Sequence, residues 1–169
     1  GCTSLRRLNL APLSNVTAVG NSFLLNCRSL EEVDLSPLSN VTSVGADFMR
    51  GCAGLRRLDV SPLSKITAFE HSFLAECTAL EEVNLEAITG VTCVEHHFMS
   101  ECTSIRVLSF APLANVTTVE YKFLFGCTSL EDVDFTGLSN VTSVGANFMD
   151  GCVLFQNVSK LGMRTVAYM

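Results

Sequence analysis

The sequence of 169 residues contains no tryptophan and only two tyrosines, and lysine and arginine together number only 11. The positive residues form no cluster and the formal net charge is −6, which argues against nucleic acid or an acidic membrane surface as partner. No apolar run reaches the roughly 18 residues of a membrane span, and no basic-then-apolar signal segment opens the chain. C-x-x-C, P-loop, G-x-S-x-G, H-E-x-x-H and G-x-G-x-x-G motifs are also missing, so no catalytic site and no cofactor are predicted.

Cysteine marks a repeat that runs through most of the chain. Seven of the eight cysteines are spaced 25 residues apart, without an insertion or deletion: Cys2, Cys27, Cys52, Cys77, Cys102, Cys127 and Cys152. A domain with a single core has no reason to keep such a period. A solenoid does, because each repeat buries its apolar face only against its neighbours.

Apolar residues recur in columns within this repeat. Leu5, Leu8 and Leu10 begin three of them, and their L-x-x-L-x-L spacing predicts a short strand with alternate residues facing inward. Stacked strands of this kind form a parallel sheet, and a proline column then marks where pairing stops. A second extended run follows at residues 16–19. The next column is phenylalanine followed by Leu or Met, which cannot both point inward from a strand, so a helical or 3₁₀ turn is predicted there.

The full pattern, C-x-x-L-x-x-L-x-L-x-P-L-x-N-V-T-x-V-x-x-x-F-L/M, resembles leucine-rich repeats, and closely the BspA-like (treponemal) class. That class has repeats of about 23 residues, here lengthened by two, and usually has Ala-Phe where this chain has Phe-Leu or Phe-Met. The resemblance covers residues 1 to about 152. It implies a right-handed α/β solenoid with a parallel sheet on its concave face and short strands and 3₁₀ turns on its convex side. It also implies protein binding or adhesion, often on microbial cell surfaces, and brings no catalytic residues.

The domain organisation follows from the period. Six 25-residue repeats are expected over residues 1–151, and a degenerate seventh repeat over residues 152–169 is expected to act as a C-terminal cap. The pattern starts at Gly1 without a cap, which predicts an open strand edge. A structural spacer, or a scaffold that self-associates end to end through that edge, is therefore the alternative function.

A second period of 50 residues lies over the first. Arginine and an acidic residue alternate in two adjacent columns, Arg6, Glu31, Arg56, Glu81, Arg106, Glu131 and Arg7, Glu32, Arg57, Glu82, the latter interrupted by Val107. This alternation predicts opposite charges about 5 Å apart on neighbouring strands. Each exposed pair contributes at most about 1 kcal/mol, so register and solubility are the expected benefits.

The cysteine column has three interpretations. Parallel stacking points the Cβ atoms the same way, and the column has an odd number of thiols, so buried free thiols are favoured. Disulfides or a metal are the alternatives. The compartment stays open, because free thiols fit a reducing compartment, whereas the family resemblance implies the cell surface.

Two surfaces are candidates for binding a protein partner. The first is the predicted concave face, formed by the outward residues Arg7, Glu32, Asp34, Arg57, Asp59, Glu82 and Asp134. This face is polar and poor in aromatic residues, whereas interface hot spots favour Trp, Tyr and Arg. Calcium binding by its acidic columns is an alternative.

The second surface lies where repeats three to five break the period. Glutamate replaces glycine in one column, and histidine and tyrosine follow, so that Glu70, His71, Glu95, His96, His97, Glu120 and Tyr121 form a predicted cluster, named here the Glu-His-Tyr patch. Stacked glutamates repel each other, and adjacent histidines could relieve that repulsion. A partner-binding patch, a zinc site on Glu95, His96 and His97 with His71, and a solvated face that tolerates sequence drift are the three interpretations.

Overall fold

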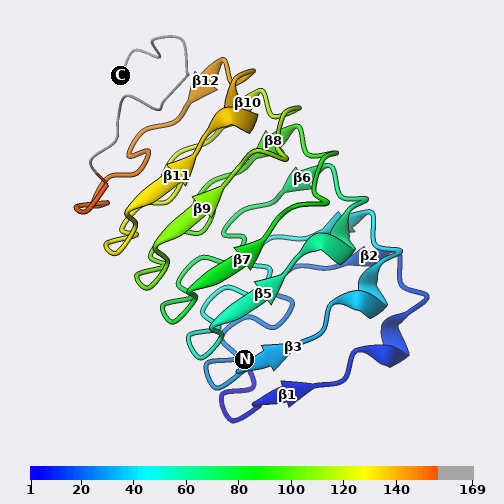
Figure 1. Ribbon diagram of the computed structural model, residues 1–169. Coiled ribbons are helices and arrows are strands. Elements are labelled where there is room, and N and C mark those ends of the chain that lie inside the picture. The colour runs from blue at the N-terminus through cyan, green and yellow to red at the C-terminus, as the bar shows by residue number, and fades with distance from the viewer. Residues whose placement is uncertain (156–169) are drawn as a thin grey trace.

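The computed structural model describes residues 1–155, which form a β-solenoid of stacked coils (Figure 1). Each coil corresponds to one repeat, and the coils are numbered one to six over residues 3–27, 28–52, 53–77, 78–102, 103–127 and 128–152. The predicted cap lies almost wholly outside the described residues. Within those residues, no helix is long and apolar enough to cross a membrane.

Every coil contains two short strands. The first strands are β1 (Arg7–Leu8), β3 (Glu32–Val33), β5 (Arg57–Asp59), β7 (Glu82–Asn84), β9 (Val107–Ser109) and β11 (Asp132–Asp134). The second strands are β2 (Ala18–Val19), β4 (Ser43–Val44), β6 (Ala68–Phe69), β8 (Cys93–Val94), β10 (Thr118–Val119) and β12 (Ser143–Val144). Both predicted strand columns are therefore confirmed, although each strand spans only two or three residues.

Short 3₁₀ helices connect the two strands in four coils: η1 (Ala11–Leu13), η2 (Ser36–Leu38), η3 (Ser61–Leu63) and η4 (Thr136–Leu138). Proline stands in the first turn of η1, η2 and η3, where its missing N–H and fixed φ suit a helix start. The α-helical part of the predicted α/β class is not confirmed. Residues 1–155 contain no α-helix, because the chain has only a few residues in which to cross from one strand to the next.

All strand pairs are parallel and join residues 25 positions apart, but the pairing is not continuous. First strands pair two by two, as β1–β3, β5–β7 and β9–β11. Second strands form the pair β2–β4 and the four-stranded sheet β6–β8–β10–β12. The 50-residue period predicted from alternating charge is thus also the unit within which first strands pair, and a continuous first-strand sheet does not form.

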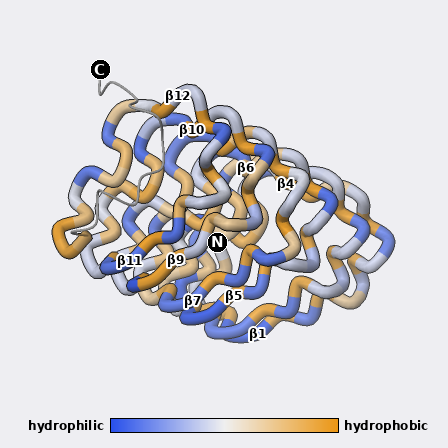
Figure 2. The backbone as a smooth tube through the Cα atoms, turned by 45° about the horizontal axis from the view of Figure 1, so that its top comes forward, coloured by the Kyte–Doolittle hydropathy of each residue, from blue (hydrophilic) through white to orange (hydrophobic). Residues whose placement is uncertain are grey.

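The core is a set of stacked apolar columns, visible in Figure 2 as hydrophobic residues repeated at equivalent places in successive coils. The phenylalanine column begins at Phe23 and continues through Phe148, with neighbouring ring centroids 5.1–5.9 Å apart and ring planes within 16° of parallel. Four of these rings are completely buried. This offset stacking adds roughly 1 kcal/mol per pair to the burial of the rings.

The turn that contains each phenylalanine is neither α-helical nor 3₁₀, so that prediction is wrong. Alternate residues have a left-handed backbone instead, as in coil one at Ser22 (φ 61°), Leu24 (φ 56°) and Asn26 (φ 55°). Side chains other than glycine disfavour this region by roughly 1–2 kcal/mol. The turn is nevertheless repeated in every coil, so its surroundings must hold it in place.

The cysteine column is one part of those surroundings. The Cys52 thiol donates a hydrogen bond to the carbonyl of left-handed Leu24 (3.3 Å), and four more cysteines repeat this contact at 3.2 Å across the following coils. The cysteines are free, and those from Cys27 to Cys127 in the column are buried. The interpretation as buried free thiols is therefore confirmed. Each thiol ties one coil to the turn of the coil before it.

Candidate functional site

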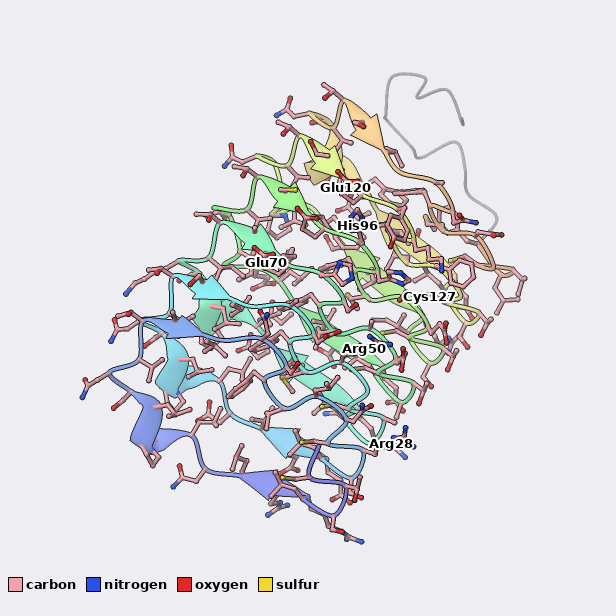
Figure 3. All side chains as sticks on the ribbon, turned by 180° about the vertical axis from the view of Figure 1, so that it is seen from behind. Arg28, Arg50, Glu70, His96, Glu120 and Cys127 are labelled. Atoms are coloured by element: carbon pink, nitrogen blue, oxygen red, sulfur yellow. The ribbon has the colours of Figure 1, made fainter. Side chains whose placement is uncertain are left out.

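The Glu-His-Tyr patch lies where the chain leaves the second strands of coils three to five. Seen from behind, Glu70, His96 and Glu120 lie along the stacked strands β6, β8 and β10 (Figure 3). Main-chain bonds keep the stacking in register, because Glu95 N–H donates to the Phe69 carbonyl and Glu120 N–H to the Val94 carbonyl, both at 2.9 Å. The β-ladder therefore brings together residues that are 25 positions apart.

Aromatic rings form the centre of the patch. The centroids of His96 and Tyr121 are 4.2 Å apart, and those of His97 and Tyr121 are 5.2 Å apart. His71 contacts both histidines of the next coil, with centroid distances of 5.4 Å to His96 and 6.0 Å to His97. Tyr121 is 37% exposed. The four rings, three from one repeat column and His97 from the next, thus form one cluster that reaches the surface.

Carboxylates flank this ring cluster. His96 Nδ1 lies 3.7 Å from Glu120 Oε2, and His96 Nε2 lies 4.0 Å from Glu95 Oε2. These contacts are too long for hydrogen bonds. His96 Nδ1 is itself buried and has no hydrogen-bond partner in the described part of the chain. The imidazole therefore sits between two carboxylates, and its Nδ1 still has unused hydrogen-bonding capacity.

Two neighbouring groups have pKa values shifted toward their neutral forms. Burial lowers the pKa of His97, and the positive charge of Lys122 lowers it further. Burial, together with the charge of Glu95, raises the pKa of the Cys93 thiol to about 11. The Cys93 thiol lies 3.6 Å from Glu95 Oε1. Both shifts favour the neutral form of the group, whereas the glutamates contribute negative charge to the patch.

The zinc interpretation finds no support in this geometry. Among residues 1–155, no three His, Cys, Asp or Glu side chains converge closely enough to hold a metal ion. The ring planes of His71 and His96 are 86° apart, and those of His71 and His97 are 53° apart. A zinc site needs such convergence of three or four ligands.

Sequence reasoning missed an ionic cluster in the neighbouring turns. Arg50 donates to Glu76 through Nε (3.1 Å) and Nη2 (2.6 Å), and through Nη1 to Asp47 (3.2 Å). Asp47 and Glu76 occupy left-handed positions of the turns in coils two and three. The only signal in the sequence was the unlike charge of these turn residues, and it gave no indication that the turns adjoin.

The other predicted surface follows the first strands. Arg7 pairs with Glu32 (3.2 Å), Arg56 with Glu81 (3.1 Å) and Arg106 with Glu131 (2.8 Å), so the predicted charge pairing is confirmed at these positions. Arg57 and Glu82 are in register but form no ion pair among the described residues. The acidic column has a local role too: the carboxylates of Asp34, Asp59 and Asp134 accept bonds from backbone N–H groups two residues on, at 2.8–3.0 Å. Hydrogen bonds from the Ser36 side chain and from the Ser36 backbone N–H lower the pKa of Asp34. These aspartates hold the turns that follow the first strands.

Solved structures share this fold. A leucine-rich repeat protein from Bacteroides ovatus aligns with a TM-score of 0.63 at 23% identity, covering 82% of this chain and 33% of its own. A leucine-rich cell surface protein from Faecalibacterium prausnitzii aligns with a TM-score of 0.62 at 18% identity, covering 83% and 42%. A T. pallidum leucine-rich repeat protein aligns with a TM-score of 0.56 at 17% identity, covering 85% and 73%. The chain thus spans about a third and two fifths of the first two proteins.

The sequence comparisons agree with the fold. No curated protein matches the sequence. The family described as BspA type leucine rich repeat region matches in six copies, over residues 1–131 and 64–161. The chain therefore belongs to the BspA type leucine-rich repeat family.

Proposed function

We propose that this chain is a non-catalytic protein-binding module and that the Glu-His-Tyr patch binds a basic segment of its partner. The observation that carries the proposal is the ring cluster around Tyr121, flanked by Glu95 and Glu120 and open to solvent. The regular repeats have glycine in the glutamate column, at Gly20, Gly45 and Gly145. The chemistry is therefore concentrated where the period breaks.

Lysine and arginine suit this patch for two reasons. A guanidinium forms charge-assisted hydrogen bonds with carboxylates such as those of Glu95 and Glu120. It also stacks on tyrosine, an interaction that contributes roughly 0.5–2 kcal/mol. The formal net charge of −6 further favours the approach of a basic partner.

Titration with a basic peptide tests this proposal. The probe is a capped hexapeptide in which arginine alternates with glycine, titrated at low and physiological salt, with Tyr121→Ala and Glu95→Gln as patch variants. Ala146→Ser is the matched control, because Ala146 occupies the Tyr121 column in coil six and is exposed. We expect Tyr121→Ala to weaken binding about tenfold, as loss of an aromatic hot spot does. Equal affinity of Tyr121→Ala and Ala146→Ser would overturn the proposal.

End-to-end association is the second candidate function. In coil one the core columns are only half-buried, at Leu5, Leu8, Leu13 and Val16, whereas Leu30, Leu38 and Val41 of coil two are fully buried. A second copy stacked on coil one would bury these residues and give the chain a scaffold role. Sedimentation across a hundredfold concentration range tests this, and a constant monomer mass would count against it.

A further inference from the structure

Four N-glycosylation sequons stand at one position of the repeat. A sequon is asparagine, any residue except proline, and then serine or threonine. Coils one, two, five and six each contain one, and its asparagines are Asn15, Asn40, Asn115 and Asn140. A further sequon, at Asn157, lies outside the described residues. Because one repeat position generates all four, their recurrence is weak evidence by itself, and the surroundings of that position carry the argument.

The fold places these asparagines at the surface. Each lies in the turn that precedes a second strand, and both the asparagine and the threonine of every described sequon are exposed. The residue between them is a valine of the core: Val41 and Val116 are fully buried, and Val141 is 7% exposed. Alternate side chains of an extended segment face opposite sides. The buried valine therefore directs both polar side chains of the sequon outward, where an attached glycan meets solvent.

The asparagine amides keep a hydrogen that the fold does not use. Asn40 Nδ2 donates to the Ser14 carbonyl of coil one at 3.3 Å. Asn115 and Asn140 donate to carbonyls of their preceding coils at 2.9 Å and 2.8 Å. A side-chain amide carries two hydrogens, so a sugar can replace one while the other keeps the bond to the preceding coil. Modification is thus compatible with the folded state.

The fold does not require asparagine at this position. Lys65 and Gly90 occupy it in coils three and four, and the second strands β6 and β8 of those coils still pair. Asn15 forms no hydrogen bond among the described residues. Threonine follows two residues later in all six coils. What asparagine adds in the other four coils is therefore a complete sequon.

The surface around the sequons carries almost no charge. The segments before and within the second strands, residues 14–18, 39–43, 64–68, 89–93, 114–118 and 139–143, contain one charged residue, Lys65. The first strands, by contrast, carry columns of arginine and acidic residues. An uncharged surface of stacked strands favours association between copies. Glycans are bulky and solubilising, and on this surface they would keep copies apart as charge does on the first strands.

We propose that the asparagines of these four sequons are acceptor sites for N-linked glycans. The donor is an oligosaccharide carried on a polyisoprenyl diphosphate. A bond forms between the anomeric carbon of the sugar and the asparagine Nδ2, and the bond from that carbon to the diphosphate breaks. The amide gives up one proton, and the polyisoprenyl diphosphate leaves.

The two coils without a sequon are those that contribute most to the Glu-His-Tyr patch. Coils three and four supply Glu70, Glu95 and all three histidines of the patch, and their strands β6 and β8 lie in the middle of the stack (Figure 1). Glycans on the other four coils would therefore leave the turns of coils three and four uncovered. The glycan sites do not depend on the function proposed for the patch.

Mass spectrometry of the protein isolated from its native cells tests the proposal. Peptide N-glycosidase F removes N-linked glycans and converts each modified asparagine to aspartate, which identifies the site. We expect conversion at the sequon asparagines and none at Asn21 and Asn147, which are exposed but lie outside any sequon. Unmodified asparagine at all four positions would overturn the proposal.

Variants of the full chain, secreted from a eukaryotic cell behind a signal peptide, test the assignment by gel mobility. Asn115→Gln and Thr117→Val should each lose one glycan relative to the parent, whereas Thr117→Ser preserves the sequon and should keep it. A glycan that persists in Asn115→Gln but is lost in Thr117→Val would lie on the threonine hydroxyl and would contradict the assignment. Circular dichroism verifies that each variant is folded.

A gain of modification provides the complementary test. Lys65→Asn completes a sequon with Thr67 in coil three, and both positions are exposed. We expect this variant to gain one glycan that the glycosidase removes. Lys65→Gln is the matched control, because it removes the same charge without creating a sequon, and its mobility should not change. Equal mobility of Lys65→Asn and Lys65→Gln would show that this position of the coil does not accept a glycan.

Discussion

Coils two and three meet very differently from coils three and four, although the same apolar columns run through all of them. Between coils three and four, the β5–β7 ladder registers Arg57 with Glu82 through Asp59 with Asn84, and β6 pairs with β8. Between coils two and three, no strand pair forms, and this boundary is called the seam. A continuous core therefore does not guarantee a continuous sheet, and coils three and four act as one structural unit.

The contrast shows what each layer of the repeat controls. Core columns set the spacing of the coils, because every interior position is filled by a stacked neighbour. Hydrogen bonding between strands responds to much smaller displacements, since a bond is lost within a few tenths of an ångström. At the boundary where no strand pair forms, Phe69 replaces the valine of the other coils and Ala53-Gly54 lacks the hydroxyls of Thr-Ser, while the core columns stay filled.

The largest expected effect comes from removing a core ring in coil four, where the strands pair with those of coil three. Phe98→Ala should lower the free energy of unfolding by about 3–5 kcal/mol, because the ring is fully buried and contacts Phe69, Phe73 and Phe123. Phe48→Ala removes an equally buried ring that lacks the Phe69 contact, so its loss should be smaller. Urea denaturation measures both. A greater loss for Phe48→Ala would contradict the difference in packing inferred here.

Alkaline pH should lower the free energy of unfolding of the whole solenoid, and this effect does not depend on the seam. Burial raises the pKa of the Cys102 thiol to about 12, whereas an unfolded thiol ionises near its ordinary value of roughly 8.5. Between these two pKa values, the folded state keeps the thiol proton that the unfolded state releases. The free energy of unfolding therefore falls as pH rises from about 9 to 12, by up to about 1.4 kcal/mol per pH unit. Cys102→Ala should have a shallower slope in denaturation between pH 9 and 11. An unchanged slope would show that Cys102 does not titrate in this way.

Removing the ion pair at the seam should have a smaller effect, confined to one boundary. Arg50→Met deletes the Arg50–Glu76 pair and should lower the free energy of unfolding by no more than about 1 kcal/mol, because both side chains are about 40% exposed. Amide exchange of Asp47 and Gly51, whose N–H groups bond across the seam, should accelerate. Arg106→Met deletes an equivalent pair, Arg106–Glu131, but the β9–β11 strand pair remains there, so amide exchange at that boundary should not accelerate. Equal acceleration at both boundaries would remove the distinction.

The smallest expected effect is a gain in stability. Glu101 has a left-handed backbone (φ 59°) in a column where coils two, five and six have glycine. Glu101→Gly should raise the free energy of unfolding by about 0.5–1 kcal/mol, because glycine adopts this conformation without a steric cost. Glu76→Gly, in the same column, also deletes the seam pair with Arg50 and should gain less. Thermal melting of the two variants distinguishes these outcomes, and a larger gain for Glu76→Gly would show that the pair contributes nothing.

Much of the fold was predictable because equivalent positions in successive repeats can be aligned with one another. Strict spacing identified the parallel strands, the buried thiols and the charge pairs such as Arg7–Glu32, each of which depends only on position within the period. The same logic placed His96 and Tyr121 side by side, one coil apart. For these features, a column in the sequence is a contact in space.

The remaining features depend on conformations that the pattern does not encode. Asn26, Gly51 and Gly126 share a column, which is a signal of left-handed backbone, but Leu24 and Met49 are also left-handed, and bulky residues give no such signal. The seam coincides with Phe69 and Ala53-Gly54, which depart from the repeat pattern, and alternating charge alone predicted no break between β4 and β6.

The seam has a mechanical consequence. Tension applied to the two ends of the solenoid passes through every boundary between coils in series, so the boundary with the fewest hydrogen bonds yields first. Coils one and two would then separate together, because β1–β3 and β2–β4 still hold them to each other. Because these two coils stay folded, the first rupture would release only the short stretch of chain that links coil two to coil three. Under tension, the described part of the chain is therefore expected to separate first at one defined boundary, the seam.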